Sequence, residues 1–199
     1  MVTIESEIPW EQIEDGLRQV PLLNKRDVFP YAGAAIELRE IPYSEVRTTS
    51  LYVARNLLAV QEAIAEDIAE EGHHPLRMES GLILGSVIDG EQKLTGFIPP
   101  IVEETDEEGM YVLDGSHRTN LGRWTGRTAF NAIHISGIRE DCPAYAYPNE
   151  WTEVVHYDEV PKEPSLRKNY REPGVLYGLY RDFGALNGSQ PRYPDQAGL

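Results

Sequence analysis

The residues best suited to chemistry follow one another in a single stretch, Tyr111–Arg118. After a short apolar run, this stretch holds a carboxylate, a glycine, a hydroxyl, an imidazole and a guanidinium in consecutive positions that begin at Asp114. The next residues are typical of a short helix that stops at Gly126. A strand that leads into a helix start collects free backbone N–H groups at the positive end of the helix dipole, and such a place suits an anion, most often phosphate. His117 and Arg118 would donate further hydrogen bonds to the same oxygens.

A simpler interpretation of the same stretch needs no ligand. Asp114 or Ser116 would then cap the helix through its side chain, and Arg118 would lie in solvent. The residues of the turn alone do not decide between the two interpretations.

The composition of the chain narrows the classes of function. With 199 residues, of which 41% are hydrophobic and 26% charged, the chain is typical of a globular protein with a core of its own. Acidic residues outnumber basic ones by 33 to 18, and the formal net charge is −15. Because affinity for nucleic acid comes largely from basic residues that neutralise phosphates, a general nucleic-acid-binding protein is disfavoured. Cys142 is the only cysteine, which excludes an internal disulfide and a multi-cysteine metal site.

The sequence gives no indication of a membrane segment. No apolar run approaches the roughly 20 residues that span a bilayer. The first residues form neither the basic nor the apolar region of a secretory signal. We therefore expect a cytoplasmic protein.

The turn must be positioned by the elements around it, and the most regular of these is helical. The pattern runs from Leu51 to Glu71 and ends at Gly72, a residue type that commonly terminates helices. Its apolar residues recur with the helical period and predict one buried face: Val53, Leu57, Val60, Ile64 and Ile68. A second helical pattern, from Trp10 to Val20, belongs to an N-terminal arm that we expect to pack on the core.

Shorter runs predict strands and turns. Four runs are alternating or continuously apolar and indicate strands: residues 36–41, 98–102, 110–113 and 129–135. Residues 81–90 suggest a hairpin with Asp89 and Gly90 at its turn. Residues 103–109 suggest an acidic turn.

From about Arg139 the chain changes character. Proline recurs often enough to exclude long regular elements, and the segment also carries a set of cations: Lys162, Arg167, Lys168, Arg171, Arg181 and Arg192. The segment is either an extension wrapped on the core or a lid whose cations reach an anionic ligand at the central turn. The sequence leaves both open.

The order of these elements resembles the ParB/sulfiredoxin superfamily. Ile41–Val46, which is I-P-Y-S-E-V, looks like the strand that opens that fold, and the helix that ends at Gly72 resembles its next helix. Gly96–Val102 resembles the superfamily's G-x-x-x-P-I-V strand, and Tyr111–Arg118 resembles its nucleotide-binding turn.

The resemblance covers about residues 36–138 and implies an α+β fold, a compact ParB/sulfiredoxin-like mixed sheet with flanking helices. Residues 73–95 form an insertion relative to that pattern. The expected organisation is an N-terminal arm at 1–35, a nucleotide-binding core at 36–138, and a Tyr- and Pro-rich C-terminal extension at 139–199 that packs on the core.

The branches of the superfamily differ at the turn. Partition proteins bind CTP through G-E-R-R and carry a helix-turn-helix domain, whereas Gly115–Arg118 is G-S-H-R and no convincing helix-turn-helix pattern follows. Sulfiredoxins use G-C-H-R, whose cysteine attacks an oxidised peroxiredoxin. Ser116 stands at that position, and a hydroxyl cannot replace a thiolate in this chemistry. The free-serine kinases carry D-G-H-x-R, with which the turn from Asp114 to Arg118 is compatible.

The kinase branch implies roles for individual residues. Asp114 would assist the substrate hydroxyl or a magnesium ion, and His117 would act in catalysis as well as in binding. The phosphates of ATP or ADP would be held by Gly115, Ser116, His117, Arg118 and Thr119. Those kinases carry a glutamate base just after the first strand, where this chain has Arg47–Ser50, R-T-T-S. Glu79, in the insertion, is the candidate for the missing base.

The expected function is therefore a nucleotide-dependent phosphotransferase, a kinase that uses ATP or ADP with Mg²⁺ on a small hydroxyl-bearing metabolite such as a hydroxy amino acid. The alternative is a nucleotide-binding regulatory or ParB-like module without phosphotransfer activity. The expected partners are the nucleotide and a small-molecule substrate, with no membrane and no dedicated set of metal ligands. A homodimer is left open.

Overall fold

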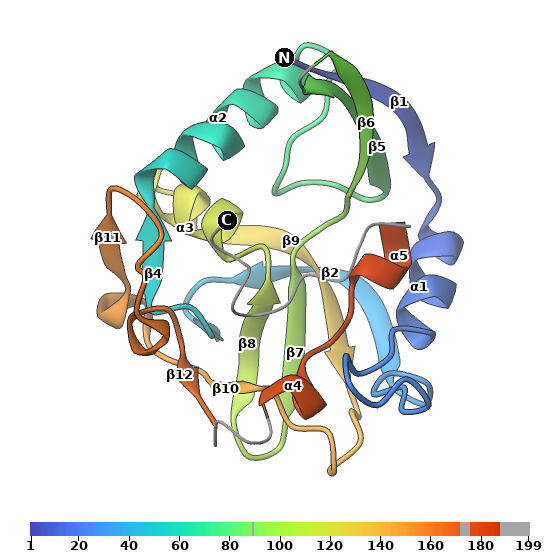
Figure 1. Cartoon of the computed structure of the whole chain (residues 1–199), viewed down its shortest axis with the longest axis vertical. Helices are drawn as coiled ribbons and strands as arrows, with labels where there is room; N and C mark the ends of the chain where they lie inside the picture. The colour runs from blue at the N-terminus through green and yellow to red at the C-terminus, as the bar shows by residue number, and fades with distance from the viewer. Residues whose placement is uncertain (89, 172–175, 188–199) are drawn as a thin grey trace.

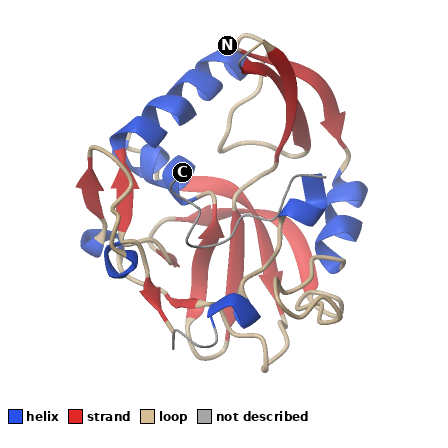
Figure 2. Cartoon of the chain, in the orientation of Figure 1, coloured by secondary structure: helices blue, strands red, loops and turns tan. Residues whose placement is uncertain are grey.

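The computed structural model describes residues 1–88, 90–171 and 176–187, and it has a mixed α+β fold, as predicted. Strands form the centre of the molecule and helices lie around them (Figure 2). The described helices are α1 Trp10–Arg18, α2 Arg55–Ala69, α3 Ser116–Trp124, α4 Leu176–Leu179 and α5 Gly184–Asn187, with 3₁₀ turns at Trp151–Glu153 and Pro164–Leu166. The described strands are β1 Val2–Ile8, β2 Ala35–Pro42, β3 Val46–Thr48, β4 Tyr52–Ala54, β5 Gly81–Ile88, β6 Glu91–Phe97, β7 Ile101–Thr105, β8 Gly109–Asp114, β9 Ala129–Ser136, β10 Ala146–Tyr147, β11 Val155–Tyr157 and β12 Asn169–Tyr170.

The central sheet has five strands in the order β2-β9-β7-β8-β3 (Figure 1). The pair β7 and β8 is antiparallel, while β9 runs parallel to β7 and β3 runs parallel to β8. The chain leaves the sheet at the end of β8, passes through α3 and returns as β9 on the other side of β7. This connection carries the central turn.

The predicted N-terminal arm and insertion meet in a second, three-stranded sheet of order β1-β5-β6. The hairpin predicted for residues 81–90 is present, with Ile88 paired to Glu91. Gly90 has a φ of 81°, as a tight hairpin turn requires, and Asp89 lies outside the described residues. The helix α2 packs on this sheet through Ile68 (Figure 1).

Strand β9 is buried on both of its faces. Ile133 and Ile135 pack with residues of α1 in one cluster, and Phe130 and Ala132 pack with residues of β2 and β3 in another. The alternation in this segment predicted a strand, which the structure confirms. The strand is buried because it lies in the interior of the sheet, where both faces are covered.

The predicted bounds of the long helix are wrong at its N-terminus. The helix α2 begins at Arg55 rather than Leu51, because the intervening residues form β4, which pairs in parallel with β11 of the extension. The predicted face is correct in part: Val53 and Ile68 are buried as predicted, whereas Val60 is 51% exposed. Leu58, which was not predicted, is buried. The helix ends at Ala69, two residues before the predicted last residue, and Gly72 follows with a φ of 86°.

Two predictions around β7 are corrected by the structure. The strand starts at Ile101, after Pro99 and Pro100, because proline has no N–H to donate to a sheet ladder. The acidic turn is confined to residues 106–108, since Glu103 belongs to β7 and is fully buried.

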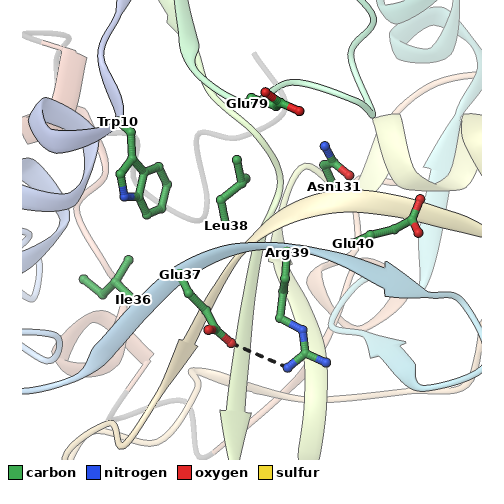
Figure 3. Close-up of a pocket in the computed structure, with 8 residues that line it drawn as sticks. All are labelled: Trp10, Ile36, Glu37, Leu38, Arg39, Glu40, Glu79 and Asn131. Atoms are coloured by element: carbon green, nitrogen blue, oxygen red, sulfur yellow. Dashed lines mark ion pairs between the residues drawn. The ribbon is translucent and has the colours of Figure 1, made fainter.

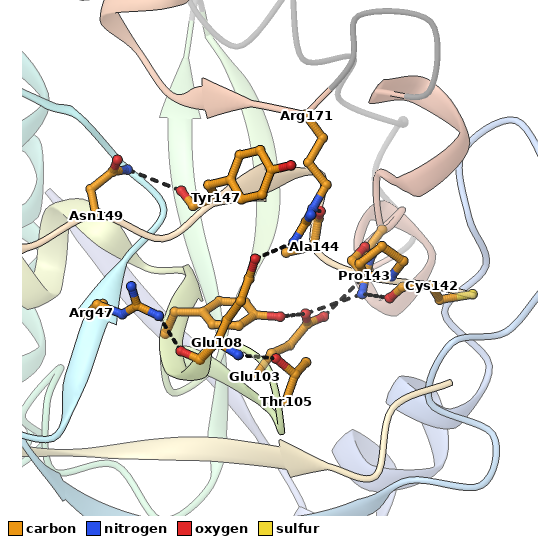
Figure 4. A network of polar contacts seen from close by, with 12 residues as sticks. Arg47, Glu103, Thr105, Glu108, Cys142, Pro143, Ala144, Tyr147, Asn149 and Arg171 are labelled. Carbon is orange, nitrogen blue, oxygen red and sulfur yellow. Dashed lines mark hydrogen bonds and ion pairs between the residues drawn. The ribbon is translucent and has the colours of Figure 1, made fainter. Parts of the chain in front are cut away.

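The C-terminal extension wraps on the core in short elements, and buried ion pairs hold it there (Figure 4). Arg181 is fully buried, and its Nε donates to Glu103 at 2.9 Å. The same carboxylate accepts hydrogen bonds from the hydroxyls of Tyr31 and Tyr111. A second ion pair joins Arg171 of the extension to Glu108 of the turn before β8.

Candidate functional site

The central turn depends on the backbone conformation of Gly115. This residue follows β8 and precedes α3 with a φ of 83°, in the left-handed region. A Cβ at this position would lie 3.0 Å from the Cβ of Pro100 and 3.2 Å from its Cα. Only glycine satisfies both constraints without strain. The sharp turn places the end of the strand and the start of the helix side by side.

The start of α3 offers backbone donors. The first intrahelical bond at this end runs from the Thr119 amide to the carbonyl of Gly115, at 3.0 Å. The amides of Ser116, His117 and Arg118 precede it, and no acceptor for them exists among the residues that the structure describes. No side chain caps the helix, so Asp114 and Ser116 do not play the capping role of the simpler interpretation.

Arg118 is buried beside these amides rather than lying in solvent. It is 7% exposed, its Nη1 donates to the carbonyl of Ile98 at 2.7 Å, and its guanidinium lies 4.3 Å from the ring centroid of Phe97. Burial lowers the pKa of Arg118 to about 10, although the charge of Asp114 acts in the opposite direction. Within the described part of the chain, Arg118 forms no ion pair.

His117 enters the site as a neutral donor. Its Nε2 accepts a hydrogen bond from the Ala54 amide at 3.4 Å, which leaves the proton on Nδ1. Its ring packs edge-on against Tyr52, with 5.4 Å between the centroids. Burial, together with the nearby charge of Lys168, lowers the pKa of His117 to about 4. At neutral pH the imidazole therefore offers a hydrogen bond and no charge.

Lys168 is a cation of the extension that acts electrostatically on the turn. Its Nζ donates to the hydroxyl of Thr49 at 3.0 Å and lies 5.2 Å from the ring centroid of Tyr145. Burial lowers the pKa of Lys168 to about 8, while Tyr52 and Asp114 raise it. Like Arg118, it forms no ion pair with a described carboxylate.

Three other cations of the extension are engaged elsewhere, and Lys162 is exposed. Arg171 and Arg181 form the ion pairs with the core described above, and Arg167 donates to the carbonyls of Pro161 and Lys162. Arg192 lies outside the described residues.

Asp114 and Thr119 differ in their exposure. Asp114 is exposed at the end of β8. Thr119 is fully buried, and its hydroxyl donates to the carbonyls of Gly115 and Ser116 at 3.2 and 3.0 Å. The side chain of Thr119 therefore shapes the turn and presents no group to a ligand.

Glu79, the candidate base, lies in a different place. It is exposed and lines a shallow pocket of about 510 Å³ together with Trp10, Leu38 and Asn131 (Figure 3). No residue of the central turn lines this pocket. The structure thus places Glu79 apart from the turn. Among the described residues, no group of three or more His, Cys, Asp or Glu side chains is placed to hold a metal ion.

Two residues of the site are not singled out by the sequence. Thr49 belongs to the stretch Arg47–Ser50, which was noted only as a departure from the kinase pattern. Lys168 was one of several basic residues in the extension, and nothing near it in the sequence distinguishes it from the others. The contact between them joins positions 119 residues apart, which no local pattern reports.

Comparison with known proteins gives one match. The family model described as ParB CE domain matches residues 12–155, which is well over half of the chain. No curated protein and no solved structure matches the chain. Among the described residues, no helix is both long enough and apolar enough to cross a membrane.

Proposed function

The chain belongs to the ParB CE domain family, and we propose that it is a ParB-like nucleotide-binding module whose turn from Asp114 to Arg118 holds the phosphates of the ligand. The serine-kinase branch has no support from the family match, so the proposal rests on binding rather than on phosphotransfer.

The burial of Arg118 without an ion-pair partner carries this proposal. Burying a guanidinium costs free energy unless an anion compensates it. The chain holds 33 acidic residues, yet no described carboxylate pairs with Arg118. The three free amides at the start of α3 lie next to it in the sequence. An anion supplied by a ligand would satisfy both the guanidinium and the amides.

The position of the turn makes a nucleotide the favoured anion. The match to the family model includes the whole of β8 and α3. The resemblance to the ParB/sulfiredoxin superfamily implies that this turn holds nucleotide phosphates. The neutral His117 adds a donor at Nδ1 without adding charge.

One carboxylate of the turn could help to hold a magnesium ion. Asp114 is the exposed carboxylate of the turn, and Mg²⁺ is commonly held by one or two carboxylates together with phosphate oxygens and water. When bound, Mg²⁺ would neutralise phosphate charge. Without it, the carboxylate of Asp114 would repel the phosphates.

The test is calorimetric titration of the full chain with ATP, ADP and CTP, each with and without Mg²⁺. Arg118→Gln should weaken binding by about 10- to 150-fold, the loss of a charged hydrogen bond worth roughly 1.5–3 kcal/mol. Arg123→Gln, an exposed arginine of the same helix, is the matched control and should bind as the wild type does. A folded wild-type chain that binds no nucleotide would refute the proposal, as would unchanged affinity in Arg118→Gln.

Phosphotransfer to a hydroxyl-bearing metabolite is the second candidate, and the exposure of Asp114 at the turn is the observation that favours it. Phosphorus NMR of the chain with ATP or ADP, Mg²⁺ and a panel of hydroxy amino acids measures turnover. If the chain is a kinase, Asp114→Asn abolishes turnover and keeps binding. Glu79→Gln tests the other candidate base and should leave turnover unchanged, because Glu79 lines a separate pocket. If the nucleotide binds but is not turned over, the kinase candidate fails and the binding module is the function that stands.

A further inference from the structure

The side chain of Lys168 lies within electrostatic reach of Asp114 and His117 of the turn. The residue is nevertheless outside the segment matched by the family model, which ends at residue 155. The backbone on both sides of Lys168 is anchored. The carbonyl of Arg167 accepts a hydrogen bond from the Leu51 amide at 2.8 Å, and the Arg171 amide donates to the carbonyl of Tyr145 at 3.1 Å. The extension therefore holds the stem of Lys168 in a defined place.

Thr49 sets the position of the ammonium group. The hydroxyl of Thr49 donates to the carbonyl of Val112 at 3.1 Å, in the strand that leads to the turn. Because its proton is used in that bond, the hydroxyl can only accept from Lys168, whose Nζ lies 3.0 Å away. Thr49 is fully buried, so this geometry is fixed by packing on every side.

Among the described residues, no carboxylate forms an ion pair with Lys168. Its charge nevertheless acts on His117, and the charge of Asp114 acts on it. Its closest named neighbours are a hydroxyl and the ring of Tyr145. A partly buried ammonium group that acts electrostatically on His117 of the turn, and that has no described ion-pair partner, is suited to a phosphate bound at the turn.

We propose that Lys168 binds a phosphate group of the nucleotide, that Thr49 positions Lys168 for this contact, and that the extension thereby completes a site which the family domain alone leaves open. This inference rests on the proposed function. It keeps the ligand class of that proposal, a nucleoside di- or triphosphate, whose phosphates would contact Lys168 as well as Arg118.

The test uses the full chain and titration with ADP and ATP. Lys168→Met keeps the apolar stem and removes the charge, and it should weaken binding by about ten-fold or more. Lys162→Met removes an exposed lysine of the same extension and should have no effect. If Lys168→Met binds as the wild type does while Arg118→Gln does not, this inference is overturned and the proposed function stands. If the folded wild type binds neither nucleotide, both fail.

The positioning role of Thr49 has its own test. Thr49→Val removes the acceptor and should weaken binding, whereas Thr49→Ser keeps the hydroxyl and should restore it. In the Lys168→Met background, Thr49→Val should have little further effect, because the two residues act through one contact. Additive losses in the double variant would show that Thr49 acts on the fold and not through Lys168.

Discussion

At the scale of single residues, Gly115 is the position with the fewest alternatives. We predict that Gly115→Ala destabilises the chain by more than the about 1–2 kcal/mol that a left-handed φ costs an ordinary residue, because the added Cβ also meets Pro100. Urea denaturation measures the loss. The variant should also weaken nucleotide binding, since the turn cannot keep its shape.

Gly126 provides the matched control for this effect. It follows the same helix with a φ of 81°, and a Cβ there would meet no atom within 4 Å. Gly126→Ala should therefore lower the free energy of unfolding only by the cost of the left-handed φ. Nucleotide binding should be unchanged. Equal costs at the two glycines would show that the contact with Pro100 does not matter.

We predict that the charge of Lys168 lowers the stability of the folded chain, although it strengthens nucleotide binding. Because its pKa is about 8 in the folded chain and higher when exposed, the unfolded chain binds more protons between that pH and about 10.5. The contribution of this group to the free energy of unfolding therefore increases as the pH rises through that window. At pH 7, without ligand, Lys168→Met should be more stable than the wild type by about 1–2 kcal/mol, a value discounted for partial exposure.

Urea denaturation of both chains from pH 7 to pH 10 measures this difference, which should shrink as pH rises. The groups that face Lys168 are Tyr52 on β4, Asp114 on β8, His117 on α3 and Tyr145 in the extension, and the substitution leaves all of them in place. Lys162→Met should show no pH-dependent difference. A less stable Lys168→Met chain at pH 7 would mean that the ammonium group serves the fold.

The residues of the site differ in how far the sequence predicts them. The turn from Asp114 to Arg118 was predictable because its donors are consecutive in the chain and a helix start brings them together by local geometry. The contact between Thr49 and Lys168 was not, because it depends on how the extension crosses the core. The burial of Arg118 depends in the same way on β6 and the residues after it, which supply Phe97 and Ile98.

At the scale of elements, α2 shows what a periodic pattern can and cannot predict. Its existence and its end before Gly72 follow from the sequence. Its start does not, since Tyr52–Ala54 have the apolar character of either element and are drawn into a strand by β11 of the extension. The predicted face also wrongly placed Val60 in the core.

The buried face of α2 in the structure and the face predicted from the sequence differ at Val60, and they predict different effects of substitution there. Ile68 is fully buried among Leu82, Leu84 and Phe97 of the small sheet, so Ile68→Ala should cost about 2–5 kcal/mol. Val60→Ala, on the same helix at a position 51% exposed, should change stability by less than about 0.5 kcal/mol. Urea denaturation of the two variants measures both. Equal losses would restore the face predicted from the sequence.

At the scale of the whole molecule, the extension carries Lys168 to Thr49, and the ion pair of Arg181 with Glu103 fastens the extension to the central sheet. Arg181 also donates to the carbonyls of Cys142, Pro143 and Leu179, so it links three points of the extension to one strand. The sequence showed these residues as one cation of a basic set and one acid of a turn. Nothing local marks them as a buried pair.

This pair should be strongly coupled. Arg181→Met would leave the carboxylate of Glu103 buried with only the hydroxyls of Tyr31 and Tyr111, and should cost about 3–5 kcal/mol. The double variant Arg181→Met, Glu103→Gln removes the uncompensated charge and should recover a large part of that loss. Arg139→Met removes an ion pair with Asp141 in which both side chains are exposed, and it should leave stability unchanged. Denaturation of these variants tests the coupling.

Nucleotide titration of Arg181→Met tests whether the ion pair also affects the affinity of the site. Because loosening the extension displaces Lys168, affinity should fall in this variant and should not fall further when Lys168→Met is added. A chain that loses stability at Arg181 but keeps full affinity would show that the extension fastens the fold without serving the site.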